Sequence, residues 1–353
     1  MTEDSTLPPH ADEAPALPAP AEGGAVTLEE VAALAGVSTM TVSRVLRDQA
    51  HVTAKTRDKV KAAIAELGYV PNRLAGALAS ARTRLIVVIV PSLGNIVFPD
   101  VLRGINAALE PRGFQAVMGI SDYDLDKEER LIETMMSWRP SGWILAGLEH
   151  TPRARQLLKA SRCPVVEVMD VDGEPIDMAV GLSHRAAGAR MAAHFLAQGR
   201  RRLGYVGGDL GRDLRAAKRL QGFEQALQAQ GLSLCARELA GGASSLRLGR
   251  GSLQRLLAAH PGLDGVYFSN DDMAMGGLMH CLHAGIAVPG QLALAGFNGL
   301  EIGEVAPQRL STVGSPRYEI GQVAAQHLLQ RLEGGQPPAV TDLGFEFIAG
   351  ETA

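Results

Sequence analysis

Hydrophobic and polar positions alternate in two different ways along this chain, and the change falls near residue 84. Between residues 26 and 68, apolar residues recur every three or four positions, which is typical of short amphipathic helices. Beyond residue 84, short apolar runs alternate with amphipathic stretches, which is typical of buried parallel strands connected by helices. The pattern predicts a small helical domain followed by a larger α/β core.

The segment TLEEVAALAGVSTMTVSRVL, residues 27 to 46, predicts two short helices joined by a tight turn. Thr27 and Glu30 have the spacing of a capping box, and Gly36 is placed to end the first helix. Ser38 is a good N-cap for a second helix that runs from Thr39 to about Leu46. This layout is typical of a helix-turn-helix, which presents its second helix to the major groove of DNA.

The second helix has an apolar face and a face suited to a DNA groove. Val42, Val45 and Leu46 are expected to face inward. The outward positions carry small, polar or basic groups: Thr39, Met40, Thr41, Ser43 and Arg44. A third helix, from the cap Thr53 to Gly68, has a basic outer face suited to phosphate contacts: Lys55, Arg57, Lys59 and Lys61. The alternative is a solvated three-helix bundle whose charges are ordinary surface.

Composition and charge limit the remaining possibilities. At 353 residues and 46% hydrophobic, the chain can fill two or three domains without disulfides. Cys163, Cys235 and Cys281 are widely spaced and form no CxxC pair, which favours a reducing cytoplasm and argues against a structural zinc site. No apolar run approaches about 18 residues and no secretion signal is evident, so we expect a cytoplasmic protein without a membrane partner.

The net charge of −4 conceals an uneven distribution. Residues 1–25 contain five acids, no Lys or Arg and several prolines, and are expected to form a disordered tail. Residues 26–80 contain seven bases and five acids, so the basic charge is local to the helical region. We expect residues 26–68 to form the DNA-binding domain, residues 69–83 a hinge with a marginal helix weakened by Gly76, and residues 84–353 a two-subdomain core that binds an effector and dimerises.

Within the core, strands are predicted at 85–90, 114–119, 143–147, 164–169, 203–208, 265–269 and 292–297. Helices are predicted at 98–112, 126–138, 152–161, 212–230, 246–260 and 270–285. Parallel sheets bind ligands beyond the carboxyl ends of their strands, and the loops expected there carry short polar residues suited to a hydroxylated ligand. Candidates for effector binding in these loops are Ser92, Asn95, Glu149, His150, Asn270 and Asn298. Each of them could instead be a helix cap.

From about residue 26 to its end, the chain resembles the lactose-repressor family of transcriptional regulators. The resemblance rests on TLEEVAALAGVSTMTVSRVL and VTAKTRDKVKAAIAELGYVPNRLAGAL, with later matches at SNDDMAMGG and VPGQLALAGFNG. It implies a helix-turn-helix of the lambda-repressor kind, a core like a periplasmic binding protein, and a dimer that reads a near-palindromic operator. No heptad-like tail follows the last predicted strand near 343–348, which favours a dimer over a tetramer.

The resemblance also implies roles for individual residues. Thr39, Met40 and Arg44 fall where family members contact base edges, with Arg44 as the guanine reader. Backbone contacts are implied for Thr41, Ser43 and Asn72, and minor-groove contacts for Ala75 and the wedge Leu78.

In the core, Arg219, Asn270 and Asn298 match effector-binding positions. Many sugar-binding members carry Asp where this chain has Asn298, and an amide tolerates an anionic ligand better than a carboxylate does. The segments PSLGNIVFPDVLRGI, MMSWRPSGWIL and VVEVMD resemble the gluconate-operon repressor branch. The predicted effector is therefore gluconate, 6-phosphogluconate or 2-ketogluconate, and its binding is expected to release the operator rather than to promote repression.

Three other interpretations are weaker. An enzyme of sugar-acid metabolism could share the core, but GGDLG at 207–211 lacks the GxGxxG spacing and no GxxxxGK[ST] is present. The segment HCLH, with His280, Cys281 and His283, could hold a metal, yet no carboxylate or fourth ligand accompanies it. An exported binding protein would share the core but would need a signal peptide. No cofactor is predicted.

Overall fold

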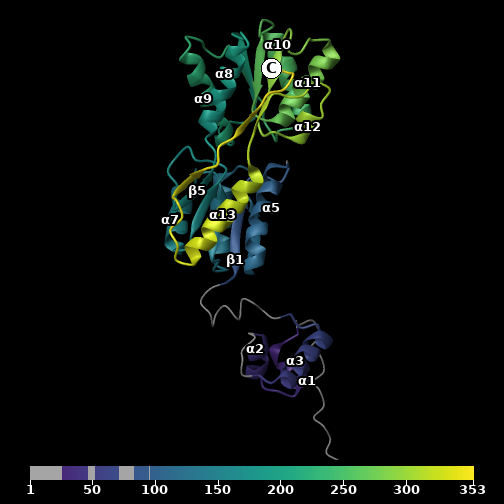
Figure 1. Ribbon diagram of the computed structural model, residues 1–353, viewed down its shortest axis with the longest axis vertical. Helices are drawn as coiled ribbons and strands as arrows, with labels where there is room; N and C mark the ends of the chain where they lie inside the picture. Colours follow the sequence, from purple (N-terminus) through teal and green to yellow (C-terminus); the bar gives the residue numbers. More distant parts are fainter. Residues whose placement is uncertain (1–25, 47–51, 71–82, 95) are drawn as a thin grey trace, which may run out of the picture. The chain divides into compact units, whose positions relative to one another are not determined.

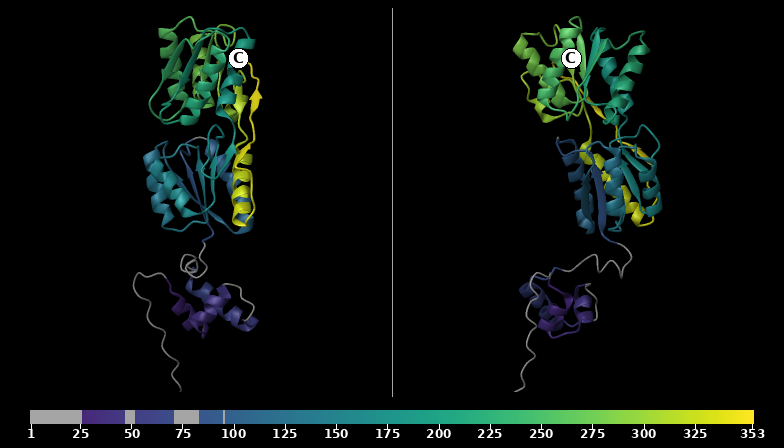
Figure 2. Two further views of the ribbon diagram at one scale, coloured as in Figure 1. Left: turned by 90° about the vertical axis from the view of Figure 1, so that its left-hand side faces the viewer. Right: turned by 180° about the vertical axis from the view of Figure 1, so that it is seen from behind.

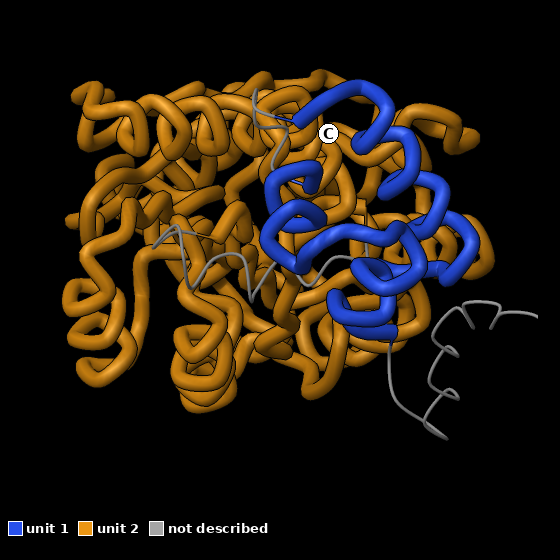
Figure 3. The backbone as a smooth tube through the Cα atoms, turned by 90° about the horizontal axis from the view of Figure 1, so that it is seen from below, with its two compact units in different colours: residues 1–81 blue, residues 82–353 orange. Residues whose placement is uncertain are grey.

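The structure, a computed structural model, describes residues 26–46, 52–70, 83–94 and 96–353 (Figure 1). The predicted tail, residues 1–25, and most of the predicted hinge lie outside the described residues. The chain divides into two compact units, Met1–Ala81 and Arg82–Ala353, which Figure 3 shows in blue and orange. Among the described residues, no helix is long and apolar enough to cross a membrane.

The first unit contains three helices, α1 (Leu28–Ala35), α2 (Thr39–Leu46) and α3 (Ala54–Leu67). The capping box at the start of α1 is formed as predicted, because the Thr27 side chain accepts from the Glu30 amide and the Glu30 carboxylate accepts from the Thr27 amide. At the start of α2, the Ser38 hydroxyl accepts from the Thr41 amide at 3.2 Å. Thr53 caps α3 in the same way, and Gly68 ends it in the left-handed conformation.

The core of this unit is formed by the buried faces of the three helices. Val31, Val42 and Val60 have no exposed surface, and Val45 is also buried. The expectation that Leu46 faces inward is wrong, because 36% of its surface is exposed. Leu46 is the last residue of α2 and lies at the edge of the buried face of that helix.

The turn between α1 and α2 depends on Gly36, whose φ of 64° and ψ of 39° are left-handed. A methyl group there would meet no neighbour, so Gly36→Ala should cost only the strain of this backbone conformation, about 1 kcal/mol. We expect the hydrogen-exchange protection of the α1 and α2 amides to fall roughly fivefold. Gly241→Ala, at an exposed glycine of the second unit, is the control and should leave these amides unchanged. Equal protection in both variants would show that the turn does not need glycine.

The second unit consists of two subdomains, each built on a parallel sheet with helices on both faces (Figures 1 and 2). The first subdomain has a six-stranded sheet in the order β11-β5-β4-β3-β1-β2. Its strands are β1 (Leu85–Val90), β2 (Gln115–Ile120), β3 (Gly142–Ala146), β4 (Val165–Val168), β5 (Met178–Gly181) and β11 (Val340–Asp342). Its helices are α5 (Val97–Leu109), η1 (Glu110–Arg112), α6 (Leu125–Met136), α7 (Pro152–Ser161) and α13 (Arg317–Leu332).

The second subdomain has a four-stranded sheet in the order β7-β6-β8-β9. Its strands are β6 (Leu203–Gly207), β7 (Ala236–Leu239), β8 (Gly265–Phe268) and β9 (Ala293–Ala295), and β10 (Thr312–Gly314) pairs antiparallel with β12 (Glu346–Ile348). Its helices are α8 (His184–Ala197), α9 (Leu214–Gln228), α10 (Leu246–Ala259), α11 (Asp271–Ala284) and α12 (Glu301–Glu304). The predicted fold class, a helix-turn-helix followed by two parallel-sheet subdomains, is confirmed.

The chain passes between the subdomains after β5, before α13 and again after β11 (Figure 1). Each sheet is covered by apolar side chains on both faces, as β1 illustrates: Ile86 and Val88 pack with residues of α5 and α13, whereas Val87 and Ile89 pack with residues of α6 and α7. This two-sided burial explains why the strands appear in the sequence as continuous apolar runs.

A close contact between α8 and α9 positions the residues that face the first subdomain. A Cβ atom on Gly188 of α8 would lie 1.9 Å from the carbonyl oxygen of Arg219, and one on Gly222 of α9 would lie 2.0 Å from the carbonyl oxygen of Arg185. Only glycine permits this approach of the two backbones. The pair of helices therefore holds the N-terminal half of α9 in a fixed place.

Candidate functional site

A pocket in the core unit is bordered by residues of both subdomains. From the first subdomain it is lined by residues at or after the carboxyl ends of β1, β2 and β3 and by the start of α6: Pro91, Ser121, Tyr123, Asp124, Leu125, Glu128, Ala146, Gly147 and Glu149. From the second subdomain it is lined by Arg212, Leu214 and Arg215, at the start of α9. The pocket thus lies where open parallel sheets place their ligands.

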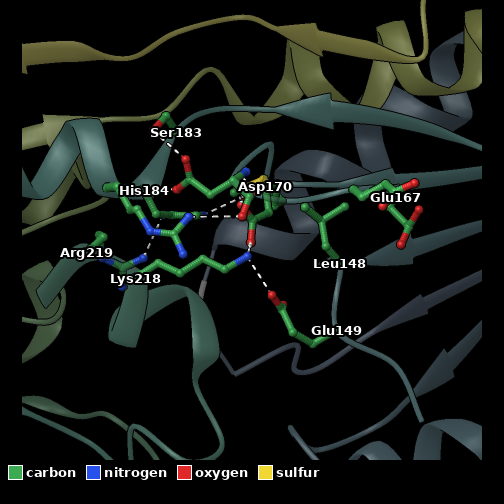
Figure 4. Close-up of polar contacts among 12 residues, drawn as sticks. Leu148, Glu149, Glu167, Asp170, Ser183, His184, Lys218 and Arg219 are labelled. Atoms are coloured by element: carbon green, nitrogen blue, oxygen red, sulfur yellow. Dashed lines mark hydrogen bonds and ion pairs between the residues drawn. The ribbon is translucent and has the colours of Figure 1, made fainter. Parts of the chain in front are cut away.

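Lys218 of α9 connects the second subdomain to two carboxylates of the first (Figure 4). Its Nζ lies 2.6 Å from Oε1 of Glu149 and 2.5 Å from Oδ2 of Asp170. The Asp170 side chain has no exposed surface, and burial raises its pKa, whereas the hydrogen bond from Lys218 opposes that rise. The three groups carry a net charge of −1 when all are ionised.

Arg219 is the next residue along α9, and its guanidinium is buried. It lies 3.1 Å from Nδ1 of His184, donates to the carbonyl oxygen of Ser269 at 3.0 Å, and stacks 4.0 Å from the centre of the Phe297 ring. Burial, together with the charge of Arg219, lowers the pKa of His184 well below its ordinary value. A neutral His184 can accept from Arg219 at Nδ1 and donate from Nε2 to the carbonyl oxygen of Met169 at 2.7 Å.

Two further arginines reach across from the second subdomain. Arg212 donates to the carbonyl oxygens of Asp122 at 2.8 Å and Tyr123 at 3.4 Å. The guanidinium of Arg215 lies 5.5 Å from the centre of the Phe98 ring and 5.9 Å from that of Tyr123. Asp122 and Tyr123 both have positive φ, so the loop after β2 turns sharply to offer these carbonyls.

Three of these basic residues, Arg215, Lys218 and Arg219, lie on α9 and are called the cationic face of α9. Residues three and four positions apart lie on one face of a helix, so the spacing brings the three positive charges together. They stand in the N-terminal half of α9, where the helix dipole adds to their attraction for an anion. The arrangement suits a ligand that carries a carboxylate or a phosphate.

His150 does not contribute to this pocket as expected. Its side chain has no exposed surface, and its Nδ1 and Nε2 lie 2.5 Å and 3.1 Å from carboxylate oxygens of Glu128 and Glu167. Oε2 of Glu167 accepts from the Ile176 amide at 2.5 Å. His150 therefore joins the loop after β3 to α6 and β4 inside the first subdomain. The sequence could not show this, because the two glutamates are distant along the chain.

The buried His150 group predicts a pH dependence of stability. Burial alone lowers the pKa of His150, but the hydrogen bonds and charges of Glu128 and Glu167 raise it to about 9. A raised histidine pKa stabilises the folded state fully below about pH 6.5, and this stabilisation is lost as pH rises through about 9. We expect the free energy of unfolding to fall by about 3 kcal/mol across that window.

Denaturant unfolding at a series of pH values measures this loss, and His150→Gln is the comparison, because glutamine cannot take up the proton. The variant should be less stable at pH 6.5 and should lack the decline seen in the natural chain. Parallel pH profiles for the two proteins would show that His150 does not carry the proton.

Of the other predicted effector residues, Glu149 lines the pocket, whereas Ser92, Arg219, Asn270 and Asn298 are not among its lining residues. The Ser92 hydroxyl accepts a hydrogen bond from the backbone amide of Gly94 at 3.0 Å. The Asn270 side-chain oxygen accepts one from the backbone amide of Met273 at 3.0 Å. Asn270 thus has the capping role that was the alternative for these positions. Asn298 is buried at 7% exposure with a φ of 124°, and Arg317 donates to its carbonyl oxygen. Asn95 lies outside the described residues.

The outward face of α2 is open to contact. Met40 is 62% exposed, Arg44 is exposed, and Nη2 of Arg44 lies 3.6 Å from Sδ of Met40. Thr39 is also exposed, whereas Thr41 and Ser43 are half-buried. Asn72, Ala75 and Leu78 lie outside the described residues.

No disulfide joins the three cysteines, Cys163, Cys235 and Cys281, all of which the structure describes. Cys281 is fully buried, and burial raises its pKa to about 11. His283, two residues further along the HCLH segment, is exposed. The side chains of Cys281 and His283 therefore do not lie on the same face of the helix. Among the described residues, no group of three or more His, Cys, Asp or Glu could hold a metal ion.

The sequence did not point to three residues that line the pocket, Tyr123, Arg212 and Arg215, or to two that contact Arg219, His184 and Phe297. For Arg215 a signal existed, because positions 215, 218 and 219 have the spacing of one helix face. For His184 and Phe297 no local signal existed, since their contacts to Arg219 join distant parts of the chain.

A helix-turn-helix unit followed by a core of this kind is the architecture of a DNA-binding transcriptional regulator. Residues 27–72 match the bacterial regulatory proteins of the lacI family, and residues 192–353 match the periplasmic binding protein-like domain. The transcriptional regulator GntR of Pseudomonas aeruginosa is 42% identical over 331 residues, which cover 93% of this chain and 96% of that protein. IdnR of Escherichia coli K12 is 37% identical over 329 residues, covering 93% and 98%.

Solved structures agree with these matches. A LacI family regulator from Silicibacter pomeroyi is 48% identical with a TM-score of 0.89, and the match covers 93% of this chain and 99% of that one. The lac repressor dimer bound to operator and the anti-inducer ONPF is 26% identical with a TM-score of 0.80, at 93% and 99% coverage. The chain belongs to the lacI family of bacterial regulatory proteins. Its relatives are named as transcriptional regulators, which confirms the interpretation as a regulator rather than an enzyme.

Proposed function

We propose that this protein represses genes for the use of a sugar acid, binds a palindromic operator as a dimer in the cytoplasm, and is released from it by gluconate or by 6-phosphogluconate or 2-ketogluconate. The cationic face of α9 is the observation that carries the choice of an acidic effector. A neutral sugar would leave these charges without a new partner, whereas a carboxylate or phosphate can accept from them.

Asn298 and the relatives support the same choice. Many sugar-binding members of the family that this chain resembles carry an aspartate at the position of Asn298. A buried carboxylate there would repel an acid, whereas the amide of Asn298 would not. The matched relatives named GntR and IdnR cover nearly the whole chain. The gluconate-operon resemblance in the sequence leads us to transfer that class of effector to this chain.

Polar contacts between the subdomains supply a means of response. Lys218 and Arg212 of the second subdomain contact Glu149, Asp170 and Asp122 of the first. An effector that binds among these groups has a different binding free energy in each arrangement of the two subdomains. Its binding therefore shifts the equilibrium between these arrangements. In the proposed mechanism the effector favours an arrangement with weaker operator binding.

Calorimetry on the full chain tests the choice of effector. Gluconate, 6-phosphogluconate and 2-ketogluconate are compared with glucose, which has no acidic group. At least one of the acids should bind, and it should bind more tightly than glucose. Preferential binding of glucose would contradict the assignment to sugar acids.

A further inference from the structure

Lys218 has two carboxylate partners that differ in how firmly they are held. Asp170 is buried, and its Oδ1 also accepts from the amide of Asp172 at 2.8 Å. Glu149 is 34% exposed in its side chain and borders the pocket. Among the residues that the structure describes, Lys218 supplies the one polar contact of the Glu149 side chain. Asp170 is therefore a fixed partner of Lys218 and Glu149 a replaceable one.

The charges of Lys218, Glu149 and Asp170 determine how an acidic ligand could reach the Lys218 ammonium. One ammonium faces two carboxylates, so a third carboxylate that approaches Lys218 would be repelled while Glu149 remains in place. If the Glu149 side chain turns toward solvent, the Lys218 ammonium remains paired with Asp170 and forms a new ion pair with the incoming carboxylate. Lys218 then still has two carboxylate partners. The partial exposure of Glu149 allows this turn without the loss of another polar contact that the structure shows.

We propose that Glu149 is an internal competitor of the effector, whose carboxylate replaces that of Glu149 at Lys218. The inference rests on the proposed function, since it takes a sugar acid as the effector. It assigns Glu149 a role in specificity: a neutral sugar cannot pair with Lys218 and so cannot displace Glu149, whereas an acid can. Exchange at Lys218 also removes the Glu149 link between the subdomains, which couples recognition of the acid to their rearrangement (Figure 4).

The opposite role for Glu149 is a direct ligand that accepts hydrogen bonds from effector hydroxyl groups. The two roles predict opposite effects of Glu149→Gln on effector affinity. Removing a direct acceptor with its charge weakens binding, because charged hydrogen bonds are the stronger ones. Removing a competitor strengthens it.

The test is calorimetry of gluconate binding to the full chain and to Glu149→Gln, with circular dichroism as the check on folding. We expect the variant to bind gluconate roughly 3- to 10-fold more tightly, the scale of one partly exposed ion pair. Glu149→Ala is a second variant and should shift the affinity in the same direction. Glu174→Gln removes an equal charge at an exposed position that does not line the pocket, and it should leave the affinity unchanged.

Equal or weaker gluconate binding by both Glu149 variants would overturn the inference while leaving the proposed function intact. A natural chain that binds none of the three sugar acids would contradict the proposed function, whatever the Glu149→Gln variant binds. Failure of both proteins to bind any of the three acids would reject the proposed function and this inference with it.

Discussion

Arg219→Ala is expected to abolish the response to the effector and to leave operator binding intact. The guanidinium is buried, and it joins His184, the carbonyl oxygen of Ser269 and the Phe297 ring. Its loss removes the charge-assisted hydrogen bonds that the cationic face of α9 is proposed to donate to the acid, and we expect the affinity for gluconate to fall by at least about 100-fold. Calorimetry measures the affinity, and fluorescence anisotropy of labelled operator DNA measures DNA binding.

Two controls separate the site from general damage. Arg219→Lys keeps the charge but loses the planar fork, so it should recover only part of the affinity. Arg247→Ala removes a guanidinium from an exposed position of α10 and should behave like the natural chain. Retention of full gluconate affinity by Arg219→Ala would refute the assignment of the pocket.

Arg44→Ala should have the largest effect on operator recognition. Arg44 is exposed on the outward face of α2, and a bidentate arginine contact with guanine contributes much of the discrimination between bases. We expect operator affinity to fall by about 10- to 100-fold and the preference for operator over unrelated DNA to fall with it. Effector binding, which is assigned to the other unit, should be unchanged.

The matched comparison is Lys59→Ala on the exposed face of α3. A phosphate contact carries no sequence information, so this variant should weaken binding to operator and to unrelated DNA alike. It should also lower the slope of affinity against salt concentration by about one. If Arg44→Ala instead lowers the affinity for operator and for unrelated DNA equally, as expected for Lys59→Ala, Arg44 contacts the DNA backbone and not a base.

Periodicity and capping chemistry are local signals, and they predicted the elements that have such signals. The caps Thr27, Ser38 and Thr53 begin the helices of the first unit, and the apolar runs at 85–90, 203–208 and 265–269 contain strands. The strands β5, β7, β10 and β11 and the helices α8, α12 and α13 were not predicted. The strands have only three or four residues each, and α12 has four. The patterns of α8 and α13 are weakly amphipathic because these helices are packed against both a sheet and another helix.

The candidate site could be predicted only where the responsible residue lies in a motif or at the end of a strand. Glu149 and Arg219 were named in this way; Glu149 pairs across the subdomain boundary with Lys218, and Arg219 follows Lys218 on α9. His150 stands directly after Glu149 in the same loop, yet its side chain points into the subdomain, toward two glutamates. Which side of a loop faces the pocket depends on partners far away in the sequence.

Release of the operator by an acidic effector is tested most directly by titrating the complex of the full chain and its operator DNA with gluconate, followed by gel shift. We expect gluconate to release the operator in a concentration-dependent way and glucose not to, because only the acid can engage the cationic face of α9. Operator binding that is unchanged or strengthened by gluconate, 6-phosphogluconate and 2-ketogluconate would contradict this expectation.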